Sequence, residues 1–229
     1  MKIKGKTLSE IFEILNHKRD LKKILNSVDK TNFNLIKQKY KDASPYPGYS
    51  KYLDIEKWMN MDLWHANILN VHKQKNLNIL DIGTGAGYFP FVCKYYGHTV
   101  KSMDLDIIPM FNELTDILDV NRTVFEIEEY KKLPEFDIKF DLITAFGVCF
   151  NNHLQTKFYK EEKAKVWDIE EWKFFINDVF ENHLNTKGRI FLRLNGEGNG
   201  TFYTEELKNY FLSLGAKIDG ERVLIEKNK

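Results

Sequence analysis

Cysteine, an excess of charge of one sign and long apolar runs are all scarce in this chain, and each shortage excludes a class of protein. The two cysteines, Cys93 and Cys149, form neither a disulfide framework nor a metal-binding pair, so we expect reduced, half-buried thiols. The formal net charge of +1 gives no general attraction to nucleic acid or to an anionic membrane. No segment has the apolar length of a signal peptide or a membrane span, so we expect a cytoplasmic protein.

The chain is long enough to bury a full core, and 43% of its residues are hydrophobic. Apolar residues recur at helical spacing in residues 7–40, where Thr7 and Glu10 form a capping box, and this pattern predicts two or three short helices. Asp54 then precedes a longer helical pattern as its predicted N-cap. We therefore expect an N-terminal helical appendage at residues 1–53 and one main domain at residues 54–229.

A glycine loop lies near the start of the main domain. Residues 79–82 predict a short apolar strand, residues 83–87 hold three glycines at alternate positions, and residues 88–96 predict a helix. Glycines at such a position let the backbone turn tightly and approach a ligand, as nucleotide-binding loops do. A second predicted strand, residues 99–103, ends at Asp104, and this spacing suits a carboxylate that accepts hydrogen bonds from a ribose diol.

Predicted strands and helices alternate after Asp104, which is typical of a parallel sheet covered on both faces. Strands are predicted at residues 123–127, 140–146 and 189–194, and helices begin near Pro109, Asp168 and Thr204. Asp219 and Gly220 then form a strong hairpin signal between two short apolar segments. The predicted fold class is α/β: a doubly wound, mostly parallel sheet of about seven strands with a reversed terminal strand.

These motifs together resemble the class I S-adenosylmethionine-dependent methyltransferases over residues 54–226. Residues 80–87 (LDIGTGAG) match the first motif of that family, Asp104 its ribose-binding acid, and residues 140–143 its fourth strand. The resemblance implies a Rossmann-like methyltransferase fold, S-adenosylmethionine as the cofactor and methyl transfer as the reaction. It also implies the following cofactor-binding residues: Asp81, Gly83, Thr84, Gly85, Gly87, Asp104, Leu105, Glu129 and Tyr130 on the adenine side, and Phe146.

The charge of the ligand separates this interpretation from a dinucleotide site. A pyrophosphate loop favours Gly-x-Gly-x-x-Gly, but Tyr88 occupies the last of these positions. Asp81 instead complements the cationic S-adenosylmethionine, directly or through water. Two plainer interpretations stay open: the glycines form only a tight turn that Asp81 caps, and Asp104 caps the turn after its strand.

The acceptor is expected at the carboxyl ends of the strands, where residues 147–153 follow the fourth predicted strand. His153 is the candidate base for an acceptor hydroxyl. Residues 151–172 form a long aromatic and charged insert, which we interpret as an acceptor-binding lid. The candidate acceptor-binding residues are Asn151, Asn152, Trp167, Asp168 and Asn195. A solvated His153 and a partly buried aromatic cluster are the alternatives, and the other five histidines are expected at the surface.

The insert also resembles, more weakly, that of bacterial O-methyltransferases acting on sugar precursors of surface polysaccharides. This resemblance favours a small-molecule acceptor such as a nucleotide-linked sugar, with no nucleic-acid or membrane partner; N-methylation and a homodimer stay open. Ala145 and Phe146 stand where magnesium-dependent catechol-type enzymes have a metal-binding acid, so no metal is predicted. Two further hypotheses are a noncatalytic scaffold with the same fold and an NAD- or nucleotide-sugar-dependent enzyme.

Overall fold

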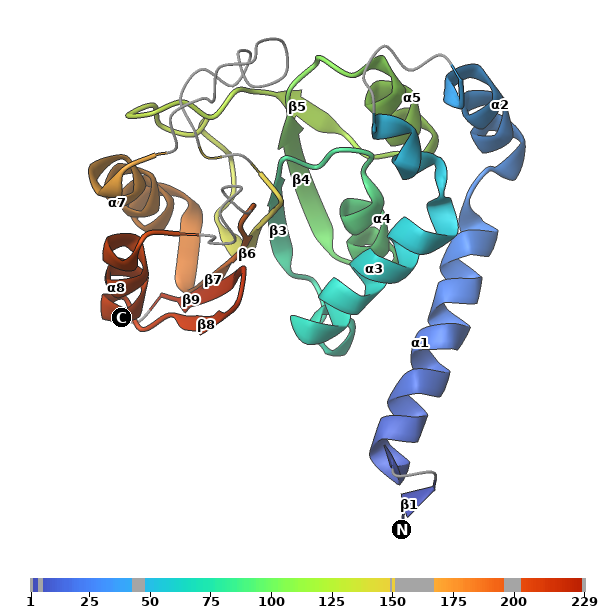
Figure 1. Cartoon of the computed structure of the whole chain (residues 1–229), viewed down its shortest axis with the longest axis horizontal. Helices are drawn as coiled ribbons and strands as arrows, with labels where there is room; N and C mark the ends of the chain where they lie inside the picture. The colour runs from blue at the N-terminus through green and yellow to red at the C-terminus, as the bar shows by residue number, and fades with distance from the viewer. Residues whose placement is uncertain are drawn as a thin grey trace. The chain divides into compact units, whose positions relative to one another are not determined.

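The computed structural model in Figure 1 describes residues 2–3, 6–42, 48–148, 150, 167–195 and 203–227. The predictions for Cys149, Asn151, Asn152 and His153 lie outside these residues. The chain forms two compact units: residues 1–76, 85–98 and 106–121 make the first, and residues 77–84, 99–105 and 122–229 make the second. The division into an appendage at residues 1–53 and a main domain at residues 54–229 stays a prediction.

The first unit is mainly helical. Its elements are β1 (Lys2–Ile3), β2 (Lys6–Thr7), α1 (Leu8–Ser27), α2 (Lys30–Tyr40), η1 (Tyr49–Leu53), α3 (Ile55–Ile68), η2 (Val71–Lys73), α4 (Tyr88–Tyr95) and α5 (Pro109–Ile117). Thr7 and Glu10 form the predicted capping box at the start of α1, and Asp54 accepts the predicted hydrogen bond from the backbone of Lys57 at the start of α3. α3 packs against α1 and α4, while α2 packs against α5.

The second unit is built on a seven-stranded sheet with the order β5-β4-β3-β6-β7-β9-β8. Its elements are β3 (Asn78–Ile82), β4 (Thr99–Asp104), β5 (Arg122–Val124), β6 (Phe140–Phe146), α7 (Ile169–Asp178), the π turn η3 (Val179–His183), β7 (Leu184–Arg193), α8 (Glu205–Ser213), β8 (Lys217–Asp219) and β9 (Arg222–Glu226). The pairs β3–β4, β3–β6, β4–β5 and β6–β7 are parallel, whereas β9 runs antiparallel to β7 and β8. The predicted reversed terminal strand is therefore confirmed.

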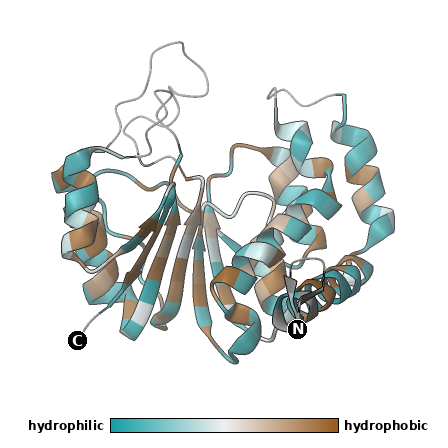
Figure 2. Cartoon of the chain, turned by 60° about the horizontal axis from the view of Figure 1, so that its bottom comes forward, coloured by the Kyte–Doolittle hydropathy of each residue, from teal (hydrophilic) through white to brown (hydrophobic). Residues whose placement is uncertain are grey.

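The core of the second unit explains why its central strands are so apolar. Figure 2 shows mostly hydrophobic residues along these strands, and four of the five apolar residues of β6 are at most 1% exposed: Phe140, Leu142, Ile143 and Ala145. Residues from α7 and α8, including Trp172 and Phe211, join the same buried cluster. Both faces of β6 are thus covered, as its nearly continuous apolar sequence predicts.

Two predicted strand boundaries are wrong. β5 ends at Val124 rather than residue 127, because β4 ends at Asp104 and that residue pairs with Val124. β7 begins at Leu184 rather than residue 189, because the register between β6 and β7 shifts and lets the extra residues into the ladder. Gly188 is needed in this irregular stretch, since a Cβ atom there would lie 2.6 Å from Leu184 Cγ.

Three histidines that were expected at the surface are buried instead. The exposed fractions of His65, His98 and His183 are 2%, 6% and 4%. Each ring has a polar neighbour within the part of the chain that the structure describes: Asp62 Oδ1 at 3.2 Å, the Val71 carbonyl oxygen at 3.1 Å and Asp178 Oδ2 at 3.5 Å, respectively. Packing of distant elements, which helical spacing does not show, covers these rings. Cys93 is fully rather than half buried.

Candidate functional site

The carboxyl ends of β3, β4 and β6 meet at one edge of the sheet in the second unit, because these strands are parallel neighbours. Gly83 follows β3, Leu105 follows β4 and Gly147 follows β6. β3 lies between β4 and β6, so the order of strands along the chain reverses beside β3. Ligands of open α/β sheets bind outside the strand ends at such a reversal. The structure therefore brings the predicted cofactor residues of this unit to one edge.

A row of polar side chains crosses the sheet just before this edge. Asp81 pairs in register with Ser102 on β4 and with Thr144 on β6. Thr144 Oγ1 donates a hydrogen bond of 2.7 Å to Asp81 Oδ1, and Asp81 is only 2% exposed. A buried carboxylate is costly unless hydrogen bonds or a cation compensate its charge.

Thr144 and Ser102 were missed as candidate residues. Their signal in the sequence is a hydroxyl in a strand that is otherwise apolar, at the position that faces Asp81 once the strands are aligned. Ser102 Oγ and Thr84 Oγ1 are both buried and have no hydrogen-bond partner among the described residues. Buried hydroxyls are usually satisfied, so Thr84 Oγ1 is a candidate for a hydrogen bond to a ligand at the glycine loop.

The start of the glycine loop is fastened to the end of β4. The backbone amides of Gly83 and Thr84 donate hydrogen bonds of 2.8 and 3.2 Å to the carbonyl oxygen of Met103. Gly83 has φ of +69°, and a Cβ atom there would lie 2.4 Å from Val148 Cγ2. Only glycine fits this position, which combines a left-handed backbone with close approach to the segment after β6.

The end of the loop, Gly85 and Gly87, belongs to the first unit. Both glycines have positive φ angles, of +53° and +82°, and Gly87 is the N-cap residue of α4. A Cβ atom on Gly87 would lie 3.0 Å from Thr115 Cγ2 of α5. The predicted strand, loop and helix are thus present.

Asp104 is held in a fixed orientation at the end of β4. Its Oδ1 accepts a hydrogen bond of 2.7 Å from the backbone amide of Leu105, and its carbonyl oxygen accepts one of 3.0 Å from Phe125 N. Arg122 Nη1 donates a hydrogen bond of 3.1 Å to the Leu105 carbonyl oxygen. Asp104 stays partly exposed, so it can both cap this turn and face a ligand.

The remaining predicted cofactor residues line the segments after β5 and β6. Glu129 is partly buried, and Tyr130 is 56% exposed with a φ of +57°. The Tyr130 ring packs edge-on against Phe174 of α7, with centroids 5.7 Å apart. Phe146 is partly buried at the end of β6, where its ring contacts Phe191. Tyr130 thus offers an accessible aromatic face in this unit.

The described candidates for acceptor binding make structural contacts. Trp167 is 5% exposed and packs among Phe150, Trp172 and Phe175, which agrees with the alternative of a buried aromatic cluster. Asp168 is the N-cap of α7 and forms a capping box with Glu171.

Asn195 connects two segments at the strand ends. Its Nδ2 donates a hydrogen bond of 2.5 Å to the carbonyl oxygen of Gly147, whose amide donates one of 2.8 Å to the Arg193 carbonyl oxygen. The role of Asn195, like those of Trp167 and Asp168, in acceptor binding stays a prediction. Within the described ranges, no group of three or more His, Cys, Asp and Glu side chains is arranged to hold a metal ion, and a reaction without a metal also stays a prediction. No helix in those ranges is long and apolar enough to cross a bilayer.

Comparison with known proteins gives a result at the level of the fold. No family model and no curated protein matches the sequence. A TehB-like S-adenosylmethionine-dependent methyltransferase from Corynebacterium glutamicum matches with a TM-score of 0.50 and 17% identity, over 79% of this chain and 98% of that chain. A Listeria monocytogenes protein assigned to the class I S-adenosylmethionine-dependent methyltransferases matches with a TM-score of 0.49 and 14% identity, over 74% of this chain but only 59% of its own.

A third solved structure contains ligands. It is the 1,6-didemethyltoxoflavin-N1-methyltransferase of Burkholderia thailandensis with bound 1,6-didemethyltoxoflavin and S-adenosylhomocysteine. The TM-score is 0.49 and the identity 15%, over 79% of this chain and 84% of that chain. Together with the strand order and the reversed β9, the match to the Corynebacterium glutamicum structure establishes that the chain has the fold of the class I S-adenosylmethionine-dependent methyltransferases.

Proposed function

We propose that the chain is an S-adenosylmethionine-dependent methyltransferase that methylates a hydroxyl of a small polar acceptor, such as a nucleotide-linked sugar. The observation that carries the proposal is the buried carboxylate of Asp81 at the base of the glycine loop, with Asp104 at the end of the neighbouring strand. A buried negative charge opposes a pyrophosphate but attracts a ligand with an ammonium and a sulfonium. The reversed β9 supports the same choice against an ordinary dinucleotide-binding sheet.

The residues present fit this cofactor. Thr84 Oγ1 has no partner among the described residues and is free to bond a polar atom of the ligand. Asp104 is partly exposed and suits the two hydroxyls of a ribose. Leu105, Glu129 and Tyr130 are proposed to flank the adenine, and Phe146 to line the far side of the cofactor. The set matches a cationic nucleoside better than a dinucleotide.

S-Adenosylmethionine, when bound, supplies an electrophilic methyl group. The chain has to hold the acceptor oxygen about 3 Å from that group and exclude water. A hydroxyl is a weak nucleophile until a base draws on its proton, and we assign this proton to an imidazole nitrogen of His153. Asn151 and Asn152 are proposed to orient the acceptor hydroxyl. These three assignments rest on position in the sequence after β6.

We further propose that the protein acts in the cytoplasm on precursors of surface polysaccharides. We propose no nucleic-acid or membrane partner. Residues 1–53 are proposed as the appendage and residues 151–172 as the acceptor-binding insert. A homodimer stays open. None of these parts is needed for the cofactor proposal, which depends on Asp81, Thr84 and Asp104.

Mass spectrometry of reaction products tests the proposed function. The purified chain is incubated with S-adenosylmethionine and a panel of nucleotide-linked sugars, and we expect the gain of one methyl group on a sugar hydroxyl. His153→Ala is expected to lower kcat by about 10²-fold or more, because a general base of this kind contributes that much. His72→Ala is the matched control, because His72 belongs to η2 and is not among the proposed site residues, and its activity should match that of the wild type.

Two outcomes separate the alternatives. Binding of S-adenosylhomocysteine with no methylation of any acceptor in the panel would favour the noncatalytic scaffold. Tighter binding of NAD than of S-adenosylhomocysteine would favour the NAD-dependent enzyme and contradict the proposal. Equal kcat for His153→Ala and wild type would contradict the assignment of the base alone.

A further inference from the structure

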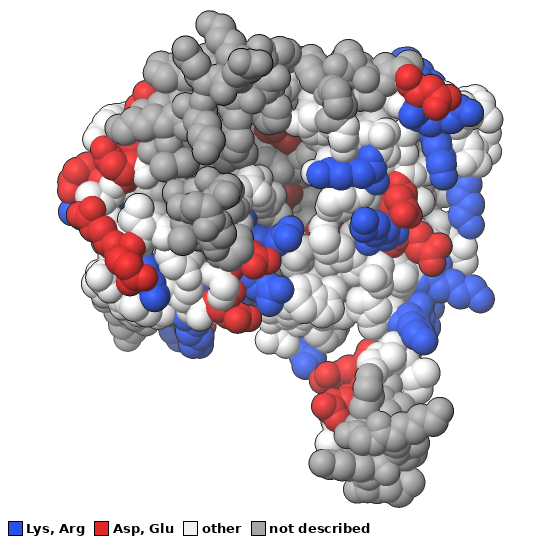
Figure 3. Space-filling view, in the orientation of Figure 1, with Lys and Arg blue, Asp and Glu red and all other residues white. Residues whose placement is uncertain are grey.

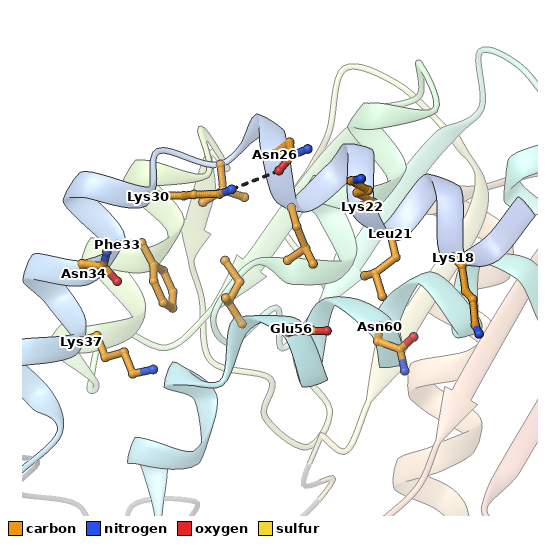
Figure 4. A pocket seen from close by; sticks show the side chains of 13 residues that line it. Lys18, Leu21, Lys22, Asn26, Lys30, Phe33, Asn34, Lys37, Glu56 and Asn60 are labelled. Atoms are coloured by element: carbon orange, nitrogen blue, oxygen red, sulfur yellow. Dashed lines mark hydrogen bonds between the residues drawn. The ribbon is translucent and has the colours of Figure 1, made fainter. Parts of the chain in front are cut away.

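A groove opens in the first unit between α1 and α2 on one side and α3 on the other. Its volume is about 710 Å³, which is within the range of pockets that receive a small molecule or several side chains. Figure 4 shows the side chains that line it, which come from residues 18–37 and 55–60. None of these residues belongs to the proposed cofactor or acceptor site, so the groove calls for an explanation of its own.

The rim of the groove is strongly basic. Its lining includes one glutamate, Glu56, and four exposed lysines: Lys18, Lys22, Lys30 and Lys37. The formal net charge of the lining is therefore +3, whereas that of the whole chain is +1. Figure 3 shows Lys and Arg side chains along the edge that α1 and α2 form in this unit. The local charge of the groove thus differs sharply from the near-neutral average.

This charge is not neutralised within the unit. Across the residues that the structure describes, none of the four rim lysines is in an ion pair, and Lys30 Nζ donates a hydrogen bond of 3.0 Å to Asn26 Oδ1. Lys39 on the same helix as Lys37, by contrast, lies 2.5 Å from Glu113 Oε1 of α5. The lysines that face the groove are therefore the ones left for a partner with negative charge.

The floor of the groove is apolar. Val28 and Phe33 are 6% and 5% exposed, while Leu21, Leu25 and Ile55 are partly exposed between the helices. Figure 4 shows Leu21 and Phe33 directed into the space between the helices, with Lys22 and Lys30 at its upper edge. An occupant must therefore bring apolar groups to the floor and negative groups to the rim.

The apolar floor and the basic rim together favour an acidic protein helix over other negatively charged partners. Single-stranded nucleic acid needs exposed aromatic faces on which its bases stack, but the one aromatic ring in the lining, Phe33, is buried. A membrane surface is flat and does not reach the apolar floor of a groove between helices. An amphipathic helix places apolar side chains at i, i+3, i+4 and i+7 into such a groove, and its flanking residues meet the rim.

We propose that this groove is the docking site for an amphipathic helix of a partner protein, in which acidic residues flank an apolar stripe. Leu21, Leu25 and Ile55 receive the apolar stripe, and the rim lysines meet the acidic flanks. The side-chain amides of Asn34 and Asn60 lie in the same lining and can bond polar groups of the helix. The charge complementarity gives the partner its orientation and speeds its association.

A displayed library of amphipathic helical peptides tests this proposal on the full chain. The polar positions sample Glu, Lys and Gln equally, and selection is carried out on the wild type and on the variant Lys22→Glu/Lys30→Glu. We expect the wild type to enrich Glu beside an apolar stripe, and the variant to lose this enrichment. The selected peptide, labelled with fluorescein, should bind the variant roughly tenfold or more weakly, and its affinity should fall as salt is raised.

The matched control is Lys23→Glu/Lys75→Glu, which makes the same change in net charge at exposed lysines outside the groove lining. Circular dichroism confirms that both double variants are folded. Equal loss of peptide binding in the two variants would contradict the proposal, as would a library result without enrichment of Glu. Tight binding of a labelled single-stranded oligonucleotide that only the groove variant loses would also overturn it, in favour of nucleic acid. Methylation assays do not enter this test, so its failure is distinct from failure of the proposed enzyme function.

Discussion

The hydroxyl of Thr144 donates a hydrogen bond to a carboxylate that is 2% exposed, and this one contact shapes the candidate site. It fixes the side chain of Asp81 within the sheet, where the field of its charge is poorly screened. Ser102 pairs in register with Asp81, and Thr84 follows Asp81 closely in the sequence. The hydroxyl oxygens of both residues are buried and lack a hydrogen-bond partner among the described residues. At the scale of single residues, the strand end therefore combines a buried carboxylate with two buried hydroxyls that lack a partner among the described residues.

Gly83 allows a test of the loop geometry that does not depend on any ligand. Gly83→Ala places a Cβ atom 2.4 Å from Val148 Cγ2 at a φ of +69°, whereas Gly97→Ala has a similar φ of +84° and open space around it. We expect Gly97→Ala to cost about 1–2 kcal/mol in the free energy of unfolding, from the left-handed backbone alone. Gly83→Ala should cost about 1–3 kcal/mol more, because of overpacking. Urea unfolding of each variant measures these differences.

The second variant Gly83→Ala/Val148→Ala separates the two causes. Removing the methyl groups of Val148 should recover most of the additional loss of Gly83→Ala and leave the cost of the backbone. Equal destabilisation by Gly83→Ala and Gly97→Ala, or no recovery in the double variant, would show that the loop does not approach the segment after β6 as described.

At the scale of elements, the sequence predicts best what neighbouring residues decide. The capping boxes at Thr7 and Asp168 are read from residues three positions apart, and both are present. The start of β7 was predicted five residues late, because residues 184–188 enter the ladder only through a register shift against β6. The burial of His183 likewise depends on contacts outside its immediate neighbours. Its ring contacts Phe136, which is distant in the sequence, and Asp178 at the end of α7.

The turn after α7 carries a pH-dependent contribution to stability. Burial lowers the pKa of His183 below 6.5, although Asp178 at 3.5 Å raises it; Lys139 and Lys132 also lower it. The unfolded chain therefore binds a proton near pH 6.5 that the folded chain binds only at lower pH. Stability that His183 provides is fully present above pH 6.5 and is lost as the pH falls below that value. We expect His183→Gln to reduce the slope of unfolding free energy against pH by up to roughly 1.4 kcal/mol per pH unit in this window.

Urea unfolding between pH 7.5 and 5 measures this slope, on the scale where a histidine titrates at about pH 6.5. The matched control is Phe211→Leu, which loosens the packing of a buried ring of α8 against Trp172 and keeps the histidine and its ring contact with Phe136. It should lower stability and leave the slope as in the wild type. A slope for His183→Gln equal to that of the wild type would mean that His183 takes up its proton equally well in the folded chain.

At the scale of the whole molecule, the fold and the cofactor motif are predictable from the sequence because their signals are local. Residues 80–87 specify a strand, a tight loop and a helix within a few positions, and Asp219 with Gly220 specifies the hairpin that reverses β9. The acceptor site has no such code. A binding lid, a buried aromatic cluster and a helix cap can all have aromatic and acidic residues in sequence. Trp167 lies in a buried cluster and Asp168 caps α7. Composition alone does not separate these roles.

The basic groove, too, was not predictable from the sequence. Lysines at residues 18, 22, 30 and 37 look like ordinary solvated residues in the sequence, and they face one groove only once α1, α2 and α3 pack together. Nonlocal packing thus created a candidate site that no motif announced. The groove belongs to the first unit, whereas the proposed cofactor residues Asp81, Thr84 and Asp104 belong to the second.

Isothermal titration calorimetry with S-adenosylhomocysteine and with NAD tests whether the glycine loop binds a methyl donor. We expect S-adenosylhomocysteine to bind the wild type with a Kd tighter than about 1 mM and NAD to bind more weakly or not at all. Asp104→Ala should weaken the binding about tenfold or more, because hydrogen bonds to a charged group are lost. The control Thr123→Val, at an exposed position of β5, should bind like the wild type. Absence of binding heat for S-adenosylhomocysteine, tighter binding of NAD, or unchanged affinity in Asp104→Ala would contradict the proposed cofactor site.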